Sequence, residues 1–401
     1  MGHNEPPPGT TNETDLKGAI ARPDTSVALR RTVLLIGVVG AITALVVDWG
    51  EAGSAANRAW PPFVLVVGLL LIGRVAHADG MFDWAAELTG RLRGSAWLLF
   101  VALLGVEAVV TAMLNLDTAV AFLTPVMVLA ARRRGLSEAP FLFGALFMAN
   151  AASLLLPGSN LTNLLVLAND HVSGAVFAAR MLPAWVAAVT VTTVVLLVRY
   201  RLLLAQPGET DRQPAAAAGR LGLIVTLTAA ALVVALRSAA LPVLGLGVIA
   251  VALGSWRGRI QLPDAAAAVD VPVFLGLFGL AVSLGTLAGS WSGPAQLMQS
   301  ANRWQTAAIG AGAAVLVNNL PAAVLLSIHA PAHPRALLIG LDLGPNLAVT
   351  GSLSALLWFQ AAKTVGCRPS LLRVSRIGIV LVPCSAAAAL AALAVFAPAH
   401  L

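Results

Sequence analysis

Apolar runs separated by short polar connections recur from residue 32 almost to the C-terminus. Many have about the 17 to 25 residues that a helix needs to cross a ~30 Å hydrocarbon core, although two in the first half are too short to cross. The pattern predicts spans near residues 32–48, 60–76, 95–114, 116–131, 140–156, 160–170, 181–204, 221–239, 242–256, 270–290, 304–317, 319–330, 334–349, 350–364 and 375–397.

Composition places these helices in lipid. Hydrophobic residues make up 58% of the 401 positions and charged residues only 11%, against about 25% charged residues in soluble domains. We therefore expect an all-α polytopic protein, multi-pass in the plasma or inner membrane. The basic residues behind the net charge of +7 lie mostly in short connections and at helix ends, which indicates topology and lipid headgroups rather than nucleic acid.

The chain divides into four segments by composition. Residues 1–31 are polar, contain several prolines and lack periodicity, which is typical of a disordered tail, here cytoplasmic. The most polar interior segment, 205–220, is the natural midpoint. It predicts a linker between a first transmembrane repeat, 32–204, and a second, 221–401.

Polar motifs occur in matched pairs in the two halves. The sequence "MLNLDTAVAFLTP" (113–125) corresponds to "LVNNLPAAVLL" (316–326), and "PGSNLTNLL" (157–165) corresponds to "LGPNLAVTGSLSALL" (343–357). Helix breaks at corresponding places in two halves are typical of secondary transporters. The pairs predict two inverted-topology repeats with re-entrant hairpins and broken helices.

The breaks themselves predict a cavity. An unpaired backbone amide in hydrocarbon costs several kcal/mol, so an interrupted helix persists only where protein or water covers it. Ser159 or Asn160 can cap the helix that restarts at Leu161, so that its positive end faces the cavity, and the hydroxyls of Thr350 and Ser352 stand at the corresponding capping positions. The residues expected to break the helices are Pro157, Gly158, Gly344 and Pro345.

Amide and hydroxyl side chains gather around these breaks, where they can bind a hydroxylated solute or an alkali cation. For any single asparagine, hydrogen bonding between helices is the alternative role. The expected substrate-binding residues are Asn115, Ser159, Asn160, Thr162, Asn163, Asn318, Asn319, Asn346, Thr350, Gly351 and Ser352.

Two acidic residues are candidates for ion or proton coupling. Asp117 lies in an apolar segment and Asp342 lies beside the second break, and an ionisable group within a span is a functional candidate. A carboxylate in headgroup water is the alternative for both. Glu107, within the third predicted span, is a weaker candidate of the same kind.

Other chemistry finds little support. Cys367 and Cys384 have no His or Cys neighbours at metal spacing, so we expect neither a metal site nor a cofactor. The sequence has no H-E-x-x-H, G-x-S-x-G or P-loop motif, which favours a transporter over an enzyme. Two basic clusters, 132–134 and the one from Lys363 to Arg376, both favour the cytoplasm, and strict inversion leaves open whether they lie on one side.

At these motifs the sequence resembles the arsenical pump membrane proteins, a family within the ion transporter superfamily that also includes sodium/proton antiporters and dicarboxylate or citrate carriers. The stretch "IGLDLGPNLAVTGSLSALLW" (339–358) is similar to the family's DLGPK-x-x-P-I-G-S-L-A-T-L-L-W signature. "NLDTAVAFLTPVM" (115–127) and "NNLPAA" (318–323) resemble its two asparagine motifs. The likeness extends more loosely across the membrane region.

The resemblance implies efflux of arsenite or antimonite, driven by the proton gradient or by a separate ATPase. The sequence departs from the signature where Asn346 replaces Lys, where Val349 and Thr350 replace Pro-Ile, and where Leu116 interrupts Asn-Asn-Asp. The identity of the solute therefore stays open, and a sodium/proton antiporter or a dicarboxylate or other anion carrier is the alternative. A homodimer is compatible with the sequence.

Overall fold

The computed structural model describes residues 25–82, 84, 95–169, 172–205, 219–236 and 238–396, and these residues are helical except for short connections. The expected tail lies outside the described residues up to residue 24, and the expected linker does so from 206 to 218. The first helix begins at Thr25 rather than Thr32. The segment "TSVALRR" follows the last proline of the tail and holds good helix formers, so the helix extends back through it.

Every expected span contains a helix, and most ends differ by a few residues, but the helix expected from residue 60 begins at Trp49. The described helices of the first half are α2 (Thr25–Val47), α3 (Trp49–Ala78), α5 (Ala96–Met113), α6 (Leu116–Arg133), α7 (Glu138–Ala152), η1 (Pro157–Ser159), α8 (Leu161–Val166), η2 (Leu167–Asn169) and α9 (Gly174–Leu204).

Those of the second half are α10 (Arg220–Ala235), α11 (Ala240–Trp256), α12 (Leu262–Val269), α13 (Val271–Ser290), α14 (Gly293–Ser300), α15 (Arg303–Val317), α16 (Asn319–Ser327), α17 (Pro334–Leu343), η3 (Gly344–Leu347), η4 (Val349–Gly351), α18 (Leu353–Thr364) and α19 (Leu371–Phe396). Six of the described segments are long and apolar enough to cross a membrane. They comprise α2, α3, α5, α9, α12 with α13, and α19.

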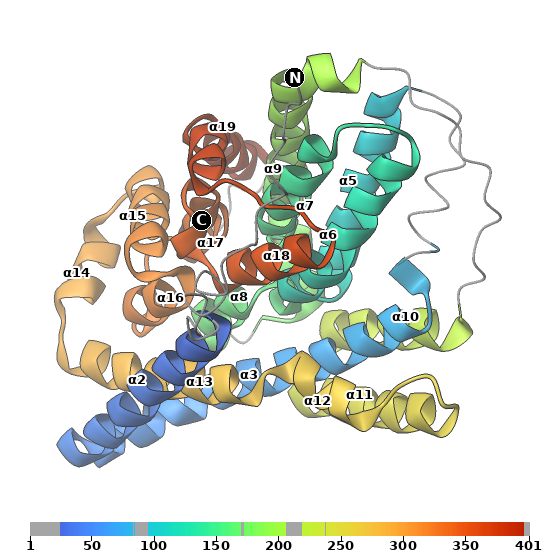
Figure 1. Ribbon diagram of the computed structural model, residues 1–401. Helices are drawn as coiled ribbons and strands as arrows, with labels where there is room; N and C mark the ends of the chain where they lie inside the picture. The colour runs from blue at the N-terminus through green and yellow to red at the C-terminus, as the bar shows by residue number, and fades with distance from the viewer. Residues whose placement is uncertain are drawn as a thin grey trace, which may run out of the picture.

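Two helical hairpins enter the bundle from opposite ends. The start of α5 lies beside the start of α7, where the rings of Phe100 and Phe141 meet edge to face at 5.4 Å, and α6 ends where α7 starts. The start of α15 lies beside the end of α16, because Gln299 Nε2 donates to the carbonyl of Ala330 at 2.7 Å. Figure 1 shows α5 and α6 on one side of the bundle and α15 and α16 on the other. The tips of the two hairpins are at Asn115 and Asn318.

The remaining helices follow the same order in both halves. The broken pair α7–α8 precedes the long helix α9, and the broken pair α17–α18 precedes the long helix α19. Across the halves, α8 packs against α16, α18 packs against α6, and α9 packs against α19. Figure 1 shows α8, α16, α17 and α18 together at the centre, above the layer that contains α2, α3 and α13. This order supports the prediction of two inverted repeats.

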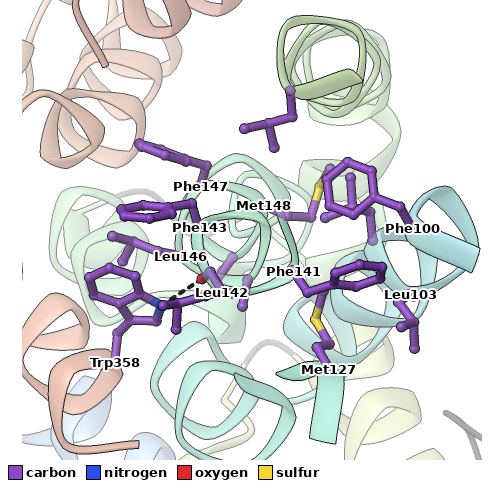
Figure 2. Packing of buried hydrophobic residues seen from close by; sticks show 14 of the residues in the cluster. Phe100, Leu103, Met127, Phe141, Leu142, Phe143, Leu146, Phe147, Met148 and Trp358 are labelled. Carbon is purple, nitrogen blue, oxygen red and sulfur yellow. Dashed lines mark hydrogen bonds between the residues drawn. The ribbon is translucent and has the colours of Figure 1, made fainter. Parts of the chain in front are cut away.

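Helix α7 is buried over almost its whole length. Each of its residues from Pro140 to Ala152 is buried, as expected for a helix that is apolar on all sides. Figure 2 shows Phe143, Leu142 and their neighbours packed between α5, α6 and α18, with the indole of Trp358 donating to the carbonyl of Leu142 at 2.7 Å. The core fixes α7 against α18, and with it the two helix breaks.

The two basic clusters lie at one end of the bundle. Arg132 forms an ion pair with Glu138, and its Nη2 atom lies 3.6 Å from the sulfur of Cys367. Arg373 lies over the ring of Phe143, close to the start of α7. Inversion of the halves thus does not separate the clusters, because α6, α18 and α19 all meet here. The positive-inside rule predicts that this end faces the cytoplasm.

Candidate functional site

Residues from all four polar motifs line one pocket, which we call the central pocket. It is a small cavity of about 40 Å³ at the meeting point of the two hairpin tips. Its polar lining consists of Asp117, Asn160, Thr162, Asn318, Asn319, Ser352 and Ser354. Its apolar lining consists of Val66, Leu116, Leu161, Phe274, Leu277 and Leu320. The site therefore joins both halves of the chain, with α3 and α13 forming one wall.

Asn318, at the tip of the second hairpin, has an unusual backbone conformation. Its φ of 78° and ψ of 149° fall in a region that is almost exclusive to glycine and costs about 1–3 kcal/mol for other residues. Its side chain holds this turn, because Nδ2 donates to the carbonyl of Thr350 at 3.1 Å and Oδ1 accepts from the amide of Leu320. Strain of this kind is common at functional sites.

The tip of the first hairpin presents an acid to the central pocket. Asn115 is buried and caps α6, with its Oδ1 accepting from the amide of Thr118 at 2.7 Å. Asp117 follows in the first turn of α6, lines the pocket and is partly exposed to it. Its place in an interior pocket excludes the headgroup alternative for this carboxylate.

The first break, 153–160, satisfies its carbonyls with side chains. Asn163 Nδ2 donates to the carbonyl of Ser153 at 2.7 Å, and the indole of Trp185 donates to that of Ala152 at 3.0 Å. Asn160 caps α8, as expected, by accepting from the amide of Thr162 at 3.1 Å. Because α8 has only six residues and this cap uses one of its amides, the side chains rather than the helix end provide the pocket's donors.

The second break, 344–352, is held by buried asparagines and close packing. Asn150 Nδ2 donates to Asn346 Oδ1 at 2.8 Å, and Asn346 Nδ2 donates to the carbonyl of Phe147 at 3.3 Å. Gly378 of α19 packs directly on this segment, because a Cβ there would lie 2.0 Å from the carbonyl oxygen of Asn346. The expected capping role of the hydroxyls is wrong. Ser352 caps no amide and bonds the hydroxyl of Ser354 at 2.8 Å instead.

Asp342 connects the two breaks. Its Oδ1 accepts from Asn160 Nδ2 at 2.8 Å and its Oδ2 accepts from the hydroxyl of Ser153 at 3.2 Å. The side chain has 0% exposure, so the headgroup alternative is wrong for this residue. The helix continues through the apolar "ALLIG" and packs against α15, which carries Asp342 into the interior. Through Asn160, it contacts the lining of the central pocket.

The expected substrate-binding residues fall into two groups. Asn160, Thr162, Asn318, Asn319 and Ser352 line the central pocket. The others are not in the lining: Asn115, Ser159, Asn163, Asn346 and Gly351 are buried around the breaks, and Thr350 is exposed, with its hydroxyl directed to the carbonyl of Val315. The four expected breakers, Pro157, Gly158, Gly344 and Pro345, all lie at the observed breaks.

Sequence reasoning missed Asn150, Ser153 and Ser354. Asn150 and Ser153 are three residues apart at the end of the apolar helix α7, and paired polar residues before a break are a signal that could have identified them. Glu107 lies outside the pocket lining, buried in α5, and no described residue bonds either of its carboxyl oxygens. Among the described residues, no three His, Cys, Asp or Glu side chains gather to hold a metal ion.

Comparison with known proteins agrees with this architecture. Residues 22–350 match the citrate transporter family, which is most of the chain. The chain belongs to the citrate transporter family. It is accordingly a membrane transporter, a multi-pass protein of the inner membrane. The family assignment also accounts for the paired breaks, since transporters commonly bind solutes between interrupted helices.

The chain is also similar to arsenical pump membrane proteins of several bacteria. The arsenical pump membrane protein of Escherichia coli K12 is 26% identical over 364 residues, which cover 81% of this chain and 84% of the relative. That of Yersinia enterocolitica is 25% identical over 354 residues, covering 80% and 82%. The YdaH transporter of Alcanivorax borkumensis, described as having an unusual topology, has a similar fold, with a TM-score of 0.56 over 87% of each chain at 14% identity.

Proposed function

We propose that this member of the citrate transporter family exports arsenite and antimonite from the cytoplasm in exchange for protons. The supporting observation is the chemistry of the central pocket. Its polar lining offers amides, hydroxyls and the carboxylate of Asp117, and none of its lining residues is Lys, Arg or His. Such a lining suits a small neutral solute with several hydroxyl groups, as As(OH)₃ and Sb(OH)₃ are.

The positions of the cysteines support binding through oxygen. Soft thiolate ligands would be the usual partners for trivalent arsenic. Cys367 lies at the basic end beside Glu138, Cys384 is exposed on α19, and neither lines the central pocket. The solute would therefore be carried with its hydroxyl groups intact.

The same lining argues against a carboxylate as the solute. A citrate or dicarboxylate ion would face Asp117 in a pocket whose lining contains no basic side chain, and an unpaired anion in such surroundings is costly. A neutral hydroxylated solute has no such cost. The arsenical pump proteins among the relatives are consistent with this choice.

Asp117 and Asp342 are the proposed coupling residues. Asp117 can exchange a proton directly in the pocket that holds the solute. Asp342 acts one contact further away, because protonation of its Oδ1 would remove an acceptor from Asn160, which lines the pocket. Proton exchange at either carboxyl would thus change the hydrogen bonds available to the solute. This scheme does not require the separate ATPase that the resemblance implied.

A sodium/proton antiporter is the second candidate, supported by Asp117. A carboxylate surrounded by hydroxyl and amide oxygens could also bind an alkali cation and release it on protonation. The two candidates differ in what moves. In the first, arsenite is exchanged for protons through the central pocket. In the second, sodium is exchanged for protons there.

The deciding experiment measures uptake into everted vesicles from a host that lacks its own exporters. We expect arsenite and antimonite to accumulate when the interior is acid, and an uncoupler to abolish the accumulation. The double variant Asn160→Ala with Asn319→Ala should lose it, while Asn57→Ala, at an exposed position on α3, should retain it. Sodium- or lithium-driven proton movement without arsenite uptake would contradict the proposal and favour the antiporter.

A further inference from the structure

A second pocket, which we call the outer pocket, lies beside the central pocket, and several helices line both. It is a cavity of about 30 Å³ between α3, α8, η2, α13 and α16. Small and apolar side chains form most of its lining, and Arg58 and Ser327 are the polar members. The hydroxyl of Ser327 donates to the carbonyl of Ala323 at 2.6 Å. The arginine therefore dominates its chemistry.

The two pockets share their walls. On α16, Asn319 and Leu320 line the central pocket, whereas Val324, Ser327 and Ile328 line the outer one. Seven residues of helix separate Leu320 from Ser327, which corresponds to about 10 Å. The helices α3, α8 and α13 likewise contribute to both. A ligand in the outer pocket would touch the helices that carry the central site.

Arg58 is placed in this pocket with unused donors. Its Nε and Nη2 atoms are buried, and no acceptor among the described residues lies within hydrogen-bond reach of either. None of the described residues that line the pocket is acidic. A guanidinium group normally satisfies its donors with a carboxylate, a phosphate or water, and leaving them unmade is costly.

The ordinary explanation for an arginine in a span is a side chain that extends to the lipid headgroups. The burial of Nε and Nη2 argues against it, because a snorkelling guanidinium has exposed nitrogens. The C-terminal end of α16 provides a favourable field for the positive charge. A dipole field, however, does not fill the positions of two missing acceptors.

We propose that the outer pocket is a second binding site, for a small oxyanion held by Nε and Nη2 of Arg58. The two nitrogens lie on one edge of the planar guanidinium, and this edge matches two oxygens of a carboxylate or phosphate group. The apolar remainder of the lining limits the ligand to a small ion. The site is independent of which solute the central pocket carries.

The test measures thermal unfolding of the full chain, purified in a neutral detergent. The Tm in inorganic phosphate, arsenate or succinate is compared with the Tm in chloride at equal ionic strength. We expect at least one of these anions to raise the Tm of the wild type by about 2 °C or more. Arg58→Gln should abolish the shift. Arg180→Gln, which removes an exposed arginine of α9, should preserve it.

Additional measurements distinguish a lipid phosphate from a free anion and provide a second variant in case Arg58→Gln does not fold. A shift that only phosphatidylglycerol in nanodiscs produces, and that Arg58→Gln removes, would assign the same site to a lipid phosphate. If Arg58→Gln does not fold, Arg58→Lys decides, because it keeps the charge but loses the paired donors and should weaken binding at least about fivefold. Equal shifts in wild type and Arg58 variants, or no shift with any anion, would overturn the proposal. If the protein proves not to transport arsenite, we still expect these shifts in Tm.

Discussion

The side-chain amide of Asn150 donates a hydrogen bond to the side-chain oxygen of Asn346, 2.8 Å away, although 196 positions separate the two residues in the sequence. Both side chains are almost completely buried. Asn150 precedes the first break and Asn346 lies within the second. This bond therefore connects the two helix breaks that lie beside the central pocket.

Removing either partner of this bond should destabilise the protein, and the effects of removing both should not be additive. We expect Asn150→Ala and Asn346→Ala each to cost about 1–3 kcal/mol, because each leaves a buried amide without its partner. The coupling energy in a double-mutant cycle should be about 0.6 kcal/mol, and at most ~1.7. Unfolding in mixed micelles measures it. The matched pair Asn150→Ala with Asn302→Ala, a distant helix cap, should be additive, and additivity of the first pair would refute the link.

The strained tip at Asn318 allows function to be separated from stability. Asn318→Gly relieves the backbone strain, whereas Asn318→Ala retains it, so the glycine variant should be more stable than the alanine variant by about 1–3 kcal/mol. Both variants lack the amide that lines the pocket, and both should lose transport. Unfolding and vesicle uptake on the same preparations provide the two readouts. Full transport by Asn318→Gly would show that the amide is not needed.

The two acids that we propose for coupling, Asp117 and Asp342, should respond differently to amide substitution. Asp342→Asn replaces one acceptor oxygen with a donor facing Asn160 or Ser153, so we expect a loss of about 1–3 kcal/mol in stability as well as of transport. Asp117→Asn should change stability by no more than about 0.5 kcal/mol, because Asp117 is partly exposed and unpaired. It should nevertheless abolish proton-driven accumulation. Proton-driven uptake that survives Asp117→Asn would place the coupling elsewhere.

The thiol of Cys367 should react slowly until the solution is strongly alkaline. Burial, helped by the neighbouring Glu138, raises the pKa of this thiol to about 11, and only the thiolate reacts. In a Cys384→Ser background, alkylation should rise about tenfold per pH unit between pH 8 and 10, whereas an ordinary thiol of pKa about 8.5 would level off. Glu138→Gln should lower the midpoint. A plateau near pH 9 in the parent would contradict this environment.

Glycine at 378 should be required by the second break. A Cβ at this position would collide with the carbonyl oxygen of Asn346, so Gly378→Ala should displace the broken segment and reduce both stability and transport. Gly312 of α15 is the matched control, since a Cβ there meets nothing within 4 Å. Gly312→Ala should be neutral or stabilising by up to about 1 kcal/mol, because alanine favours a helix. Similar effects of the two substitutions would argue against close packing at Asn346.

The local features of the fold could be read from single stretches of sequence. Apolar runs predicted a helix for each span because the bilayer sets the length and the composition of a crossing segment. Pro157, Gly158, Gly344 and Pro345 predicted the breaks because proline lacks an amide proton and glycine is flexible. The matched order of the motifs in the two halves predicted opposing hairpins, and the observed hairpins at Asn115 and Asn318 support it.

The sequence did not predict which polar residues cap helices, which line the pocket and which are buried elsewhere. Ser352 and Thr350 looked like helix caps, yet Ser352 bonds Ser354 and Thr350 is exposed. Asp342 looked equally suited to headgroup water, and it proved to be fully buried beside Asn160. The partners of such groups come from distant segments, so neighbouring residues in the sequence carry little information about them.

The sequence by itself determined that this is a membrane transporter of broken helices, because hydrophobic length, proline and glycine act locally. Only the tertiary structure decided which side chains line the central pocket. Asn160 and Asn319 line the pocket while Asn163 and Asn346 support it, although all four are asparagines beside breaks. The packing of α7 against α18 and of α8 against α16 sets that difference, since helix rotation is fixed by contacts between segments far apart in the chain.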